Sequence, residues 1–142
     1  MPRVSMFVYS ESADPEVTPQ GQKLKIINPY ATLNPIFVPG AFSFSISLGL
    51  QGVEHGIEHA LVITFSLNEE NSPNIIDTGE LRFKTENDPA NINIPVQYQG
   101  FALSIDCKNV VFRQNGEYVS KVYFNGDLIG QFPIYCHGRE LI

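Results

Sequence analysis

The sequence predicts an all-β protein, a two-sheet antiparallel β-sandwich of eight or nine strands. Apolar residues recur mainly at every second position, which is the period of a half-buried strand rather than of a helix. Ten prolines in 142 residues disfavour long helices. Turn-forming residues separate the apolar segments at short intervals. A chain of this length suits one domain, which we place over residues 1–142, with a substantial core.

The first half of the chain contains four expected strands. Residues 4–10 and 24–28 are short apolar segments between turn-forming residues. The next two strands have one apolar face each, made by Phe42, Phe44, Ile46 and Leu48 and by Leu61, Ile63, Phe65 and Leu67. Serines at 43, 45 and 47 and Thr64 occupy the alternate positions, so we expect the apolar faces to form the core.

The connections between these strands are less regular. Three prolines fall in residues 29–39, around the apolar trio Ile36, Phe37 and Val38. We expect the trio to cap the open end of the sandwich, with an exposed recognition loop as the alternative. Residues 50–61 have apolar spacings typical of a helix, but Gly52 and Gly56 each weaken a helix by about 1 kcal/mol relative to alanine. We therefore expect a turn over 51–56 and a strand beginning near Glu58.

The second half contains further strands at 75–84, 92–98 and 101–111, followed by a hairpin. The arms of the hairpin are 116–124 and 128–135, joined at Asn125-Gly126, a pair that favours a tight turn with positive φ. Pro133 lacks an N–H group, so the second arm is expected at a sheet edge or beside a bulge.

One segment matches a catalytic motif. His55, Glu58 and His59 follow the H-x-x-E-H pattern, in which two histidines on one helical face bind zinc and the glutamate activates water. In a strand, two histidines four positions apart would be separated by about 13 Å, too far to share an ion. We expect a polar strand entry with exposed histidines, and keep a metal-dependent hydrolase at these residues as the alternative.

Other ligand sites have weaker support. Acidic residues near expected loops could bind calcium if the loops converged: Glu11, Asp14, Glu16, Glu69, Glu70 and Asp77. The absence of Trp removes the commonest platform for stacking on sugars, although Tyr can replace it in a carbohydrate-binding sandwich. No phosphate-binding glycine pattern or serine-nucleophile motif is present, and no cofactor is expected.

Composition and cysteine spacing limit the partners and the location. A net charge of −6, with nine scattered Lys and Arg, argues against nucleic acid or a membrane surface as the partner. Cys107 and Cys136 match no metal or redox spacing, so we expect two reduced thiols, with a disulfide as the alternative. The first residues lack the apolar segment of a secretory signal, and a cytoplasmic location is expected.

The order of several turn and strand motifs resembles an uncharacterised bacterial family of small β-sandwich proteins. These motifs are Gly21, Pro39-Gly40-Ala41-Phe42, Gly56-Ile57-Glu58-His59, Asn115-Gly116-Glu117-Tyr118, Phe124-Asn125-Gly126-Asp127 and Phe132-Pro133-Ile134. The resemblance implies an immunoglobulin-like or C2-like sandwich of bacterial or phage origin. It transfers no activity and assigns no role to a residue.

These observations favour a non-enzymatic interaction or accessory module that uses loops or a strand edge to bind a protein partner. The alternatives are the metal-dependent hydrolase at His55, Glu58 and His59 and a carbohydrate- or calcium-binding sandwich. A continuous helix over residues 50–60 would support the hydrolase, whereas a turn or strand there would not.

Overall fold

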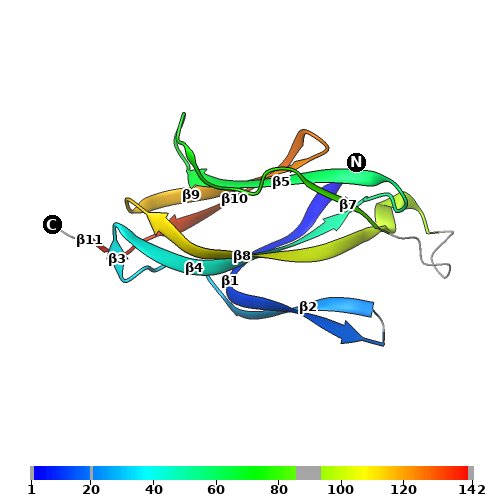
Figure 1. The fold of residues 1–142 in the computed structure, drawn as a ribbon, viewed down its shortest axis with the longest axis horizontal. Coiled ribbons are helices and arrows are strands. Elements are labelled where there is room, and N and C mark those ends of the chain that lie inside the picture. The colour runs from blue at the N-terminus through cyan, green and yellow to red at the C-terminus, as the bar shows by residue number, and fades with distance from the viewer. Residues whose placement is uncertain (1, 20, 86–93, 141–142) are drawn as a thin grey trace.

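The computed structural model describes residues 2–19, 21–85 and 94–140 (Figure 1). In these ranges the chain is mostly strand, with one 3₁₀ turn at Val96–Tyr98 and no α-helix. The strands are β1 (Arg3–Thr18), β2 (Gly21–Pro29), β3 (Phe37–Val38), β4 (Gly40–Gln51), β5 (Glu58–Leu67), β6 (Asn74–Asp77), β7 (Leu81–Lys84), β8 (Gly100–Phe112), β9 (Gly116–Phe124), β10 (Asp127–Cys136) and β11 (Arg139–Glu140). No helix within the described ranges is long and apolar enough to cross a membrane.

The strands form two antiparallel sheets that pack face to face, which confirms the predicted sandwich. Sheet A has the order β2-β1-β4-β8, and sheet B has the order β10-β9-β5-β6, with β7 also paired to β5. A small parallel pair, β11 with β3, lies apart from both. The described strands outnumber the predicted eight or nine for two reasons. The two-residue strands β3 and β11 were not predicted, and the expected strand 75–84 is divided into β6 and β7.

A turn between β6 and β7 divides that expected strand. Gly79 has a φ of +65°, and its N–H donates to Asp77 Oδ1 at 2.9 Å. The Thr78 hydroxyl donates to the Gly79 carbonyl at 2.8 Å and accepts from the Ile63 N–H of β5 at 3.0 Å. The Thr78 N–H still donates to the Ile63 carbonyl at 3.1 Å, and the side-chain hydrogen bonds end the strand there, as expected where Asp and Thr side chains compete with the sheet ladder.

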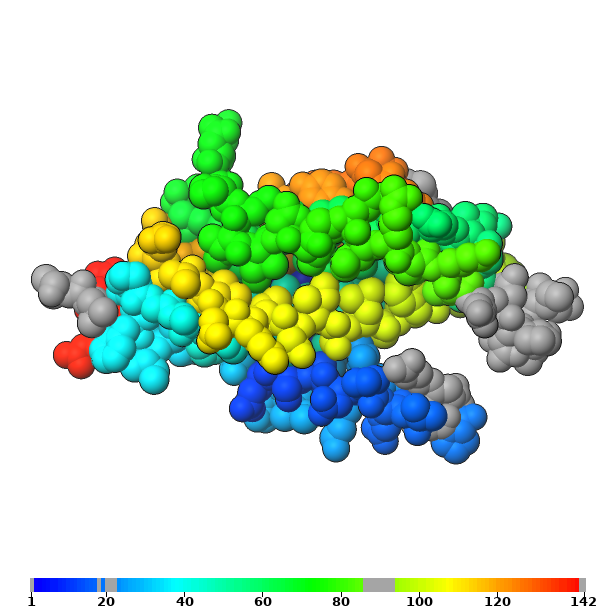
Figure 2. Space-filling view, viewed as in Figure 1, coloured from blue at the N-terminus to red at the C-terminus, as the bar shows by residue number. Residues whose placement is uncertain are grey.

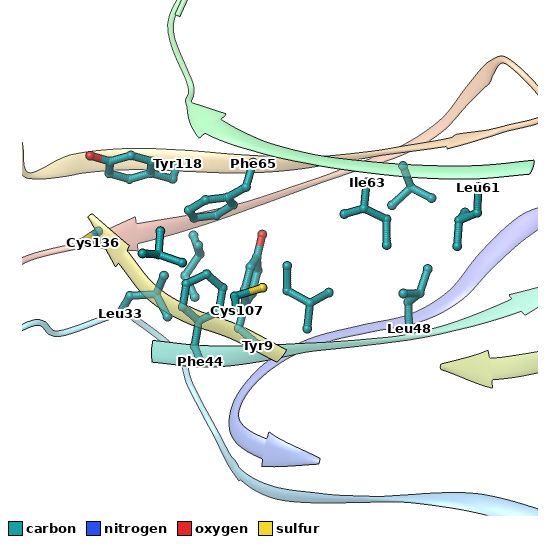
Figure 3. Packing of buried hydrophobic residues seen from close by; sticks show 14 of the residues in the cluster. Tyr9, Leu33, Phe44, Leu48, Leu61, Ile63, Phe65, Cys107, Tyr118 and Cys136 are labelled. Carbon is teal, nitrogen blue, oxygen red and sulfur yellow. The ribbon is translucent and has the colours of Figure 1, made fainter. Parts of the chain in front are cut away.

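The core lies between β4 and β5, as the alternating sequence predicts (Figure 3). The inward-facing residues of both strands are at most 2% exposed: Phe44, Ile46 and Leu48 of β4 and Leu61, Ile63 and Phe65 of β5. The Phe44 and Phe65 rings pack with centroids 5.6 Å apart. Strand register is therefore confirmed for the two central strands.

The polar face of β4 is also buried, which the sequence did not predict. Ser45 is 2% exposed and Ser47 is fully covered. After Ser10, β1 leaves β4 and pairs with β2. This outer part of sheet A folds over the face of β4 and β8 that is turned away from sheet B (Figure 1), and its Pro15 and Leu24 line a hollow with residues 100–104 of β8. The serines are small enough to let this third layer approach. Ser45 Oγ donates to Asp106 Oδ1 at 2.8 Å.

One side of the sandwich is closed by β1 against β10. The Tyr9 hydroxyl reaches across from sheet A, donates to the Phe132 carbonyl at 2.6 Å and shares a 2.6 Å hydrogen bond with Ser120 Oγ. Phe7 stacks on Phe132 with centroids 4.3 Å apart. Burial raises the pKa of Tyr9 well above its ordinary value, so the hydroxyl stays protonated and able to donate.

The connecting segments agree with the sequence in part. Residues 52–57 are irregular, with Gly52 and Gly56 at φ +77° and +82°, so the expected turn is confirmed. Of the apolar trio expected to cap the sandwich, Val38 is buried, but Ile36 and Phe37 are 81% and 44% exposed, so the trio as a whole does not form the expected cap. The expected strand 92–98 is wrong for residues 94–98, and residues 92–93 lie outside the described part. There the Tyr98 N–H donates to the Pro95 carbonyl at 2.9 Å, which closes a tight turn after the proline.

The predicted hairpin is confirmed. Asn125 and Gly126 have φ values of +50° and +89°, as a tight turn between right-twisted strands requires. Strand β10 is the edge of sheet B and has a register shift between Leu128 and Gly130, so both expectations drawn from Pro133 hold.

Replacing the most enclosed aromatic ring should destabilise the whole domain. Phe65 is fully buried and packs on four other rings, so Phe65→Ala should lower the free energy of unfolding by about 3–5 kcal/mol in chemical denaturation. Phe37, at 44% exposed, is the control, and Phe37→Ala should change stability by less than about 1 kcal/mol. Equal losses would show that Phe65 does not organise the core.

The hairpin turn can be tested separately. Gly126→Val should lower the free energy of unfolding by about 1 kcal/mol or more, because a β-branched residue disfavours positive φ. Asp127→Val, one position later and inside β10, should not incur this penalty. A thermal midpoint unchanged by Gly126→Val would contradict the turn.

Candidate functional site

The three residues of the H-x-x-E-H motif lie in different environments and do not converge. His55 is in the turn before β5, where its N–H donates to Gln99 Oε1 at 3.0 Å and its ring contacts the Thr85 hydroxyl. Glu58 begins β5 and forms an exposed 2.9 Å ion pair with Arg82. His59 follows on the opposite face of the strand. The helix that a zinc site would need is absent from this segment, which is turn and strand.

His59 is buried, at 7% exposed, which corrects the expectation that both histidines are solvent-exposed. Its ring packs near Phe124 and Phe83, with centroids 5.0 and 5.7 Å away. Nε2–H donates to the Glu54 carbonyl at 2.8 Å, and Nδ1 accepts from Asn125 Nδ2 at 3.1 Å. Both ring nitrogens are occupied, so the imidazole acts as a link between the turn before β5 and the β9–β10 hairpin.

Asn125 completes this link. Its Oδ1 accepts from the Ala60 N–H at 2.8 Å, and its own N–H donates to the Ala60 carbonyl at 2.8 Å. The amide orientation is therefore determined by Ala60, and Nδ2 is the group left to meet His59. This network stabilises the fold and leaves no ring nitrogen of His59 available to a metal ion.

The acidic residues considered as calcium ligands are spread over separate elements. Glu11, Asp14 and Glu16 were expected near a loop after residue 10, but that segment is strand, because β1 continues to Thr18. Glu69 and Glu70 are in the loop after β5, and Asp77 is on β6. Among the described residues, no group of three His, Cys, Asp or Glu side chains is placed to hold a metal ion.

Both cysteines are free and buried, as expected. Burial raises the pKa of Cys107 and of Cys136 from the ordinary 9.0 to about 11, so both are neutral thiols near pH 7. A thiol needs the thiolate form to act as a nucleophile. The raised pKa values disfavour this form in both cysteines, and Cys107 lies in the wall of a groove.

That groove, called the lateral groove below, runs between the edges of the two sheets on the side opposite Tyr9. It consists of two adjoining hollows of about 650 and 270 Å³ that share Ile75, Val111 and Arg113. One wall is the second half of β8 with Arg113 just after it, and the other is β6 with the loop after β5. Figure 2 looks onto this side, with β8 in yellow, β5 and β6 in green, and the loop projecting from the surface.

The lateral groove is apolar inside and charged at its margins. Ile105, Ile76 and Val110 pack against or belong to the core, whereas Ile75 and Val111 are 38% and 48% exposed. Tyr118 and Leu67 line the smaller hollow. The charged residues at the margins are Asp77, Asp106, Lys108, Arg113 and Glu69. Apolar side chains with a charged rim are typical of surfaces that bind protein segments.

The backbone of β8 adds a second means of binding. Strand β8 pairs with β4 along one edge and, within the described residues, with no strand along the other. Its alternate N–H and C=O groups therefore point toward the lateral groove unpaired. A register shift opposite Phe42 and Phe44, with Asn109 at φ +53°, interrupts the edge near Lys108. Such a bulge and lysine are devices by which edge strands avoid indiscriminate pairing.

Sequence reasoning anticipated a strand edge but not its residues. The sequence predicts Ile75 and Val111 in two separate strands. The spacing of residues within each strand does not show that β6 and β8 lie side by side. The available signal is Lys108-Asn109, a charged and turn-prone pair inside a largely apolar strand, which is typical of an edge strand with a bulge.

Comparison with known proteins supplies no closer guide. No protein-family model matches the sequence, and no curated protein is similar to it, so the resemblance to small bacterial sandwich proteins stays a prediction. Part of the alkylpurine DNA glycosylase AlkC of Pseudomonas fluorescens, bound to DNA containing an abasic site analogue, is similar at a TM-score of 0.48 and 10% identity. Part of a β-glucosidase from Kluyveromyces marxianus is similar at 0.41 and 10%. This chain is covered to 96% in both, but spans only 30% and 15% of those proteins.

The role of His59 can be tested through stability. His59→Ala should lower the free energy of unfolding by about 2 kcal/mol, because it removes a buried ring and leaves the Asn125 amide without its acceptor. His55→Ala, at a half-buried turn position, should cost less than half as much. Adding Asn125→Gly to His59→Ala should cost less than the sum of the two, since they share a hydrogen bond. Fully additive losses would contradict the network.

Proposed function

We propose that this protein is a non-enzymatic interaction module that binds an extended segment of a protein partner along the free edge of β8. The lateral groove carries the proposal, because it combines unpaired strand backbone with an apolar floor. In strand addition, main-chain hydrogen bonds supply affinity and pockets for alternate side chains supply specificity. The lateral groove offers both.

The dimensions and charge of the site favour such an occupant. An extended chain rises about 3.3 Å per residue, and residues 105–112 of β8 could pair with a segment of similar length. The margins carry three carboxylates and two cations rather than a basic stripe, so a phosphate backbone would find no matching surface. The Cys107 thiol in the wall of the groove is neutral near pH 7 because its pKa is raised. Among the described side chains there, no nucleophile lies beside a base.

The proposal can be tested with a displayed library of random ten-residue peptides selected on the purified protein. Peptides with apolar residues at alternate positions should be enriched. Val111→Glu should weaken their binding by about tenfold or more, because the new carboxylate would be buried without a partner. Backbone amides of residues 105–111 should exchange with solvent more slowly when peptide is bound.

Leu128→Glu is the matched control, since Leu128 is 45% exposed against 48% for Val111 and lies on the edge strand of the opposite side. It should leave peptide binding unchanged. A failure to enrich any peptide, or binding that survives Val111→Glu and is lost with Leu128→Glu, would contradict the proposal. A concentration-dependent dimer that Val111→Glu dissociates would identify a second copy as the occupant instead.

A further inference from the structure

A hollow of different chemistry lies at the end of sheet A where β1 begins, β4 ends and β8 begins. This hollow, called the tyrosine hollow below, has a volume of about 280 Å³ and is lined by Arg3, Gln51, Gly52, Gln97 and Tyr98. None of these residues lines the lateral groove. The volume is close to the lower limit of ligand pockets, about 300 Å³, and suits a single ring.

The ring of Tyr98 supplies the aromatic surface of the tyrosine hollow. It is 74% exposed, although the turn that carries it is held in place. The Gln99 carbonyl accepts from the Gly52 N–H at 2.8 Å, and Gln99 Oε1 accepts from the His55 N–H at 3.0 Å. These bonds tie the turn to the segment between β4 and β5. An exposed ring on a fixed backbone is pre-organised for a ligand, because little freedom is lost on binding.

Polar side chains accompany this ring. Leu50 points into the core, so Gln51 faces the outside of sheet A, and Arg3 lies opposite Gln51 on the same face. Arg3 Nε–H donates to Gln51 Oε1 at 2.8 Å, which orients both side chains. Among the described residues, this leaves both Nη groups of Arg3 and Nε2 of Gln51 for a ligand. Gln97 adds an amide, which has both donors and an acceptor.

We propose that the tyrosine hollow binds a sugar ring of a carbohydrate chain. One face of a sugar ring carries C–H groups that can stack on an aromatic ring, while its hydroxyl groups both donate and accept hydrogen bonds. The tyrosine hollow offers this combination of an aromatic face, several N–H donors and an amide oxygen.

Other ligands match the tyrosine hollow less well. An apolar peptide segment would meet no aliphatic side chain among the described residues of its lining. A nucleobase can also stack on a tyrosine, but the net charge of −6 disfavours the phosphates of a nucleic acid. The tyrosine hollow is separate from the lateral groove, and its assignment does not rest on the proposed function.

Electrophoresis of the purified protein through gels that contain one polysaccharide each tests this proposal. Dextran, xylan and β-glucan are the neutral polymers, and alginate and polygalacturonate are the acidic ones. At least one polymer should retard the protein, and comparison of the two groups shows whether Arg3 meets a hydroxyl or a carboxylate. Tyr98→Ala should weaken binding about tenfold or more. Its thermal midpoint should stay unchanged, because the ring is largely exposed.

Tyr135→Ala is the matched control, since Tyr135 is 61% exposed and lies on β10, and it should retain binding. Gln97→Ala should weaken binding, whereas Gln131→Ala, at an exposed position of β10, should not. Val111→Glu, in the lateral groove, should also leave sugar binding unchanged.

Retardation by none of the polymers, or retardation that survives Tyr98→Ala, would overturn the proposal. Sugar binding that is lost with Val111→Glu would overturn it as well, as would binding of a free nucleoside and of no sugar. None of these results bears on the strand-edge function, which the peptide library tests separately.

Discussion

The apolar faces of β4 and β5 bury each other, and the rest of the structure depends on that contact. Phe44, Ile46 and Leu48 meet Leu61, Ile63 and Phe65 with almost no exposed surface. The two strands are consecutive in sequence, so the short glycine-containing turn over residues 52–57 must carry the chain from one sheet to the other. β1 and β8 then pair on either side of β4, while β9 and the β6–β7 pair flank β5.

The two sides of the sandwich close differently. On one side, the Tyr9 hydroxyl and the Phe7–Phe132 stack join β1 to β10 across the sheets. On the other, β7 meets the start of β8 through Phe83 and Phe101, whose centroids are 4.7 Å apart, but β6 is only four residues long. β8, of thirteen residues, extends past it and leaves the lateral groove. The surface that we assign to partner binding is therefore a consequence of unequal strand lengths.

The H-x-x-E-H segment illustrates why a motif depends on its backbone. On a helix, residues four apart face the same way, and the histidines would meet at a metal. Here the segment passes from turn to strand, so His55 bonds toward Thr85 while His59 is enclosed between Phe83 and Phe124. Hydrogen bonds to the Glu54 carbonyl and Asn125 then use both nitrogens of His59, and the residue links two turns.

Local information in the sequence was sufficient for the all-β class, the register of β4 and β5 and the Asn125-Gly126 turn, because side-chain alternation and positive φ are properties of neighbouring residues. The burial of Ser45 and Ser47 was not predictable, since it depends on the β1–β2 hairpin folding over sheet A. The lateral groove and the burial of His59 likewise join distant segments, Ile75 with Val111 and His59 with Asn125. Only tertiary packing determines which edges and turns meet, because contacts between distant segments leave no periodic trace in either segment.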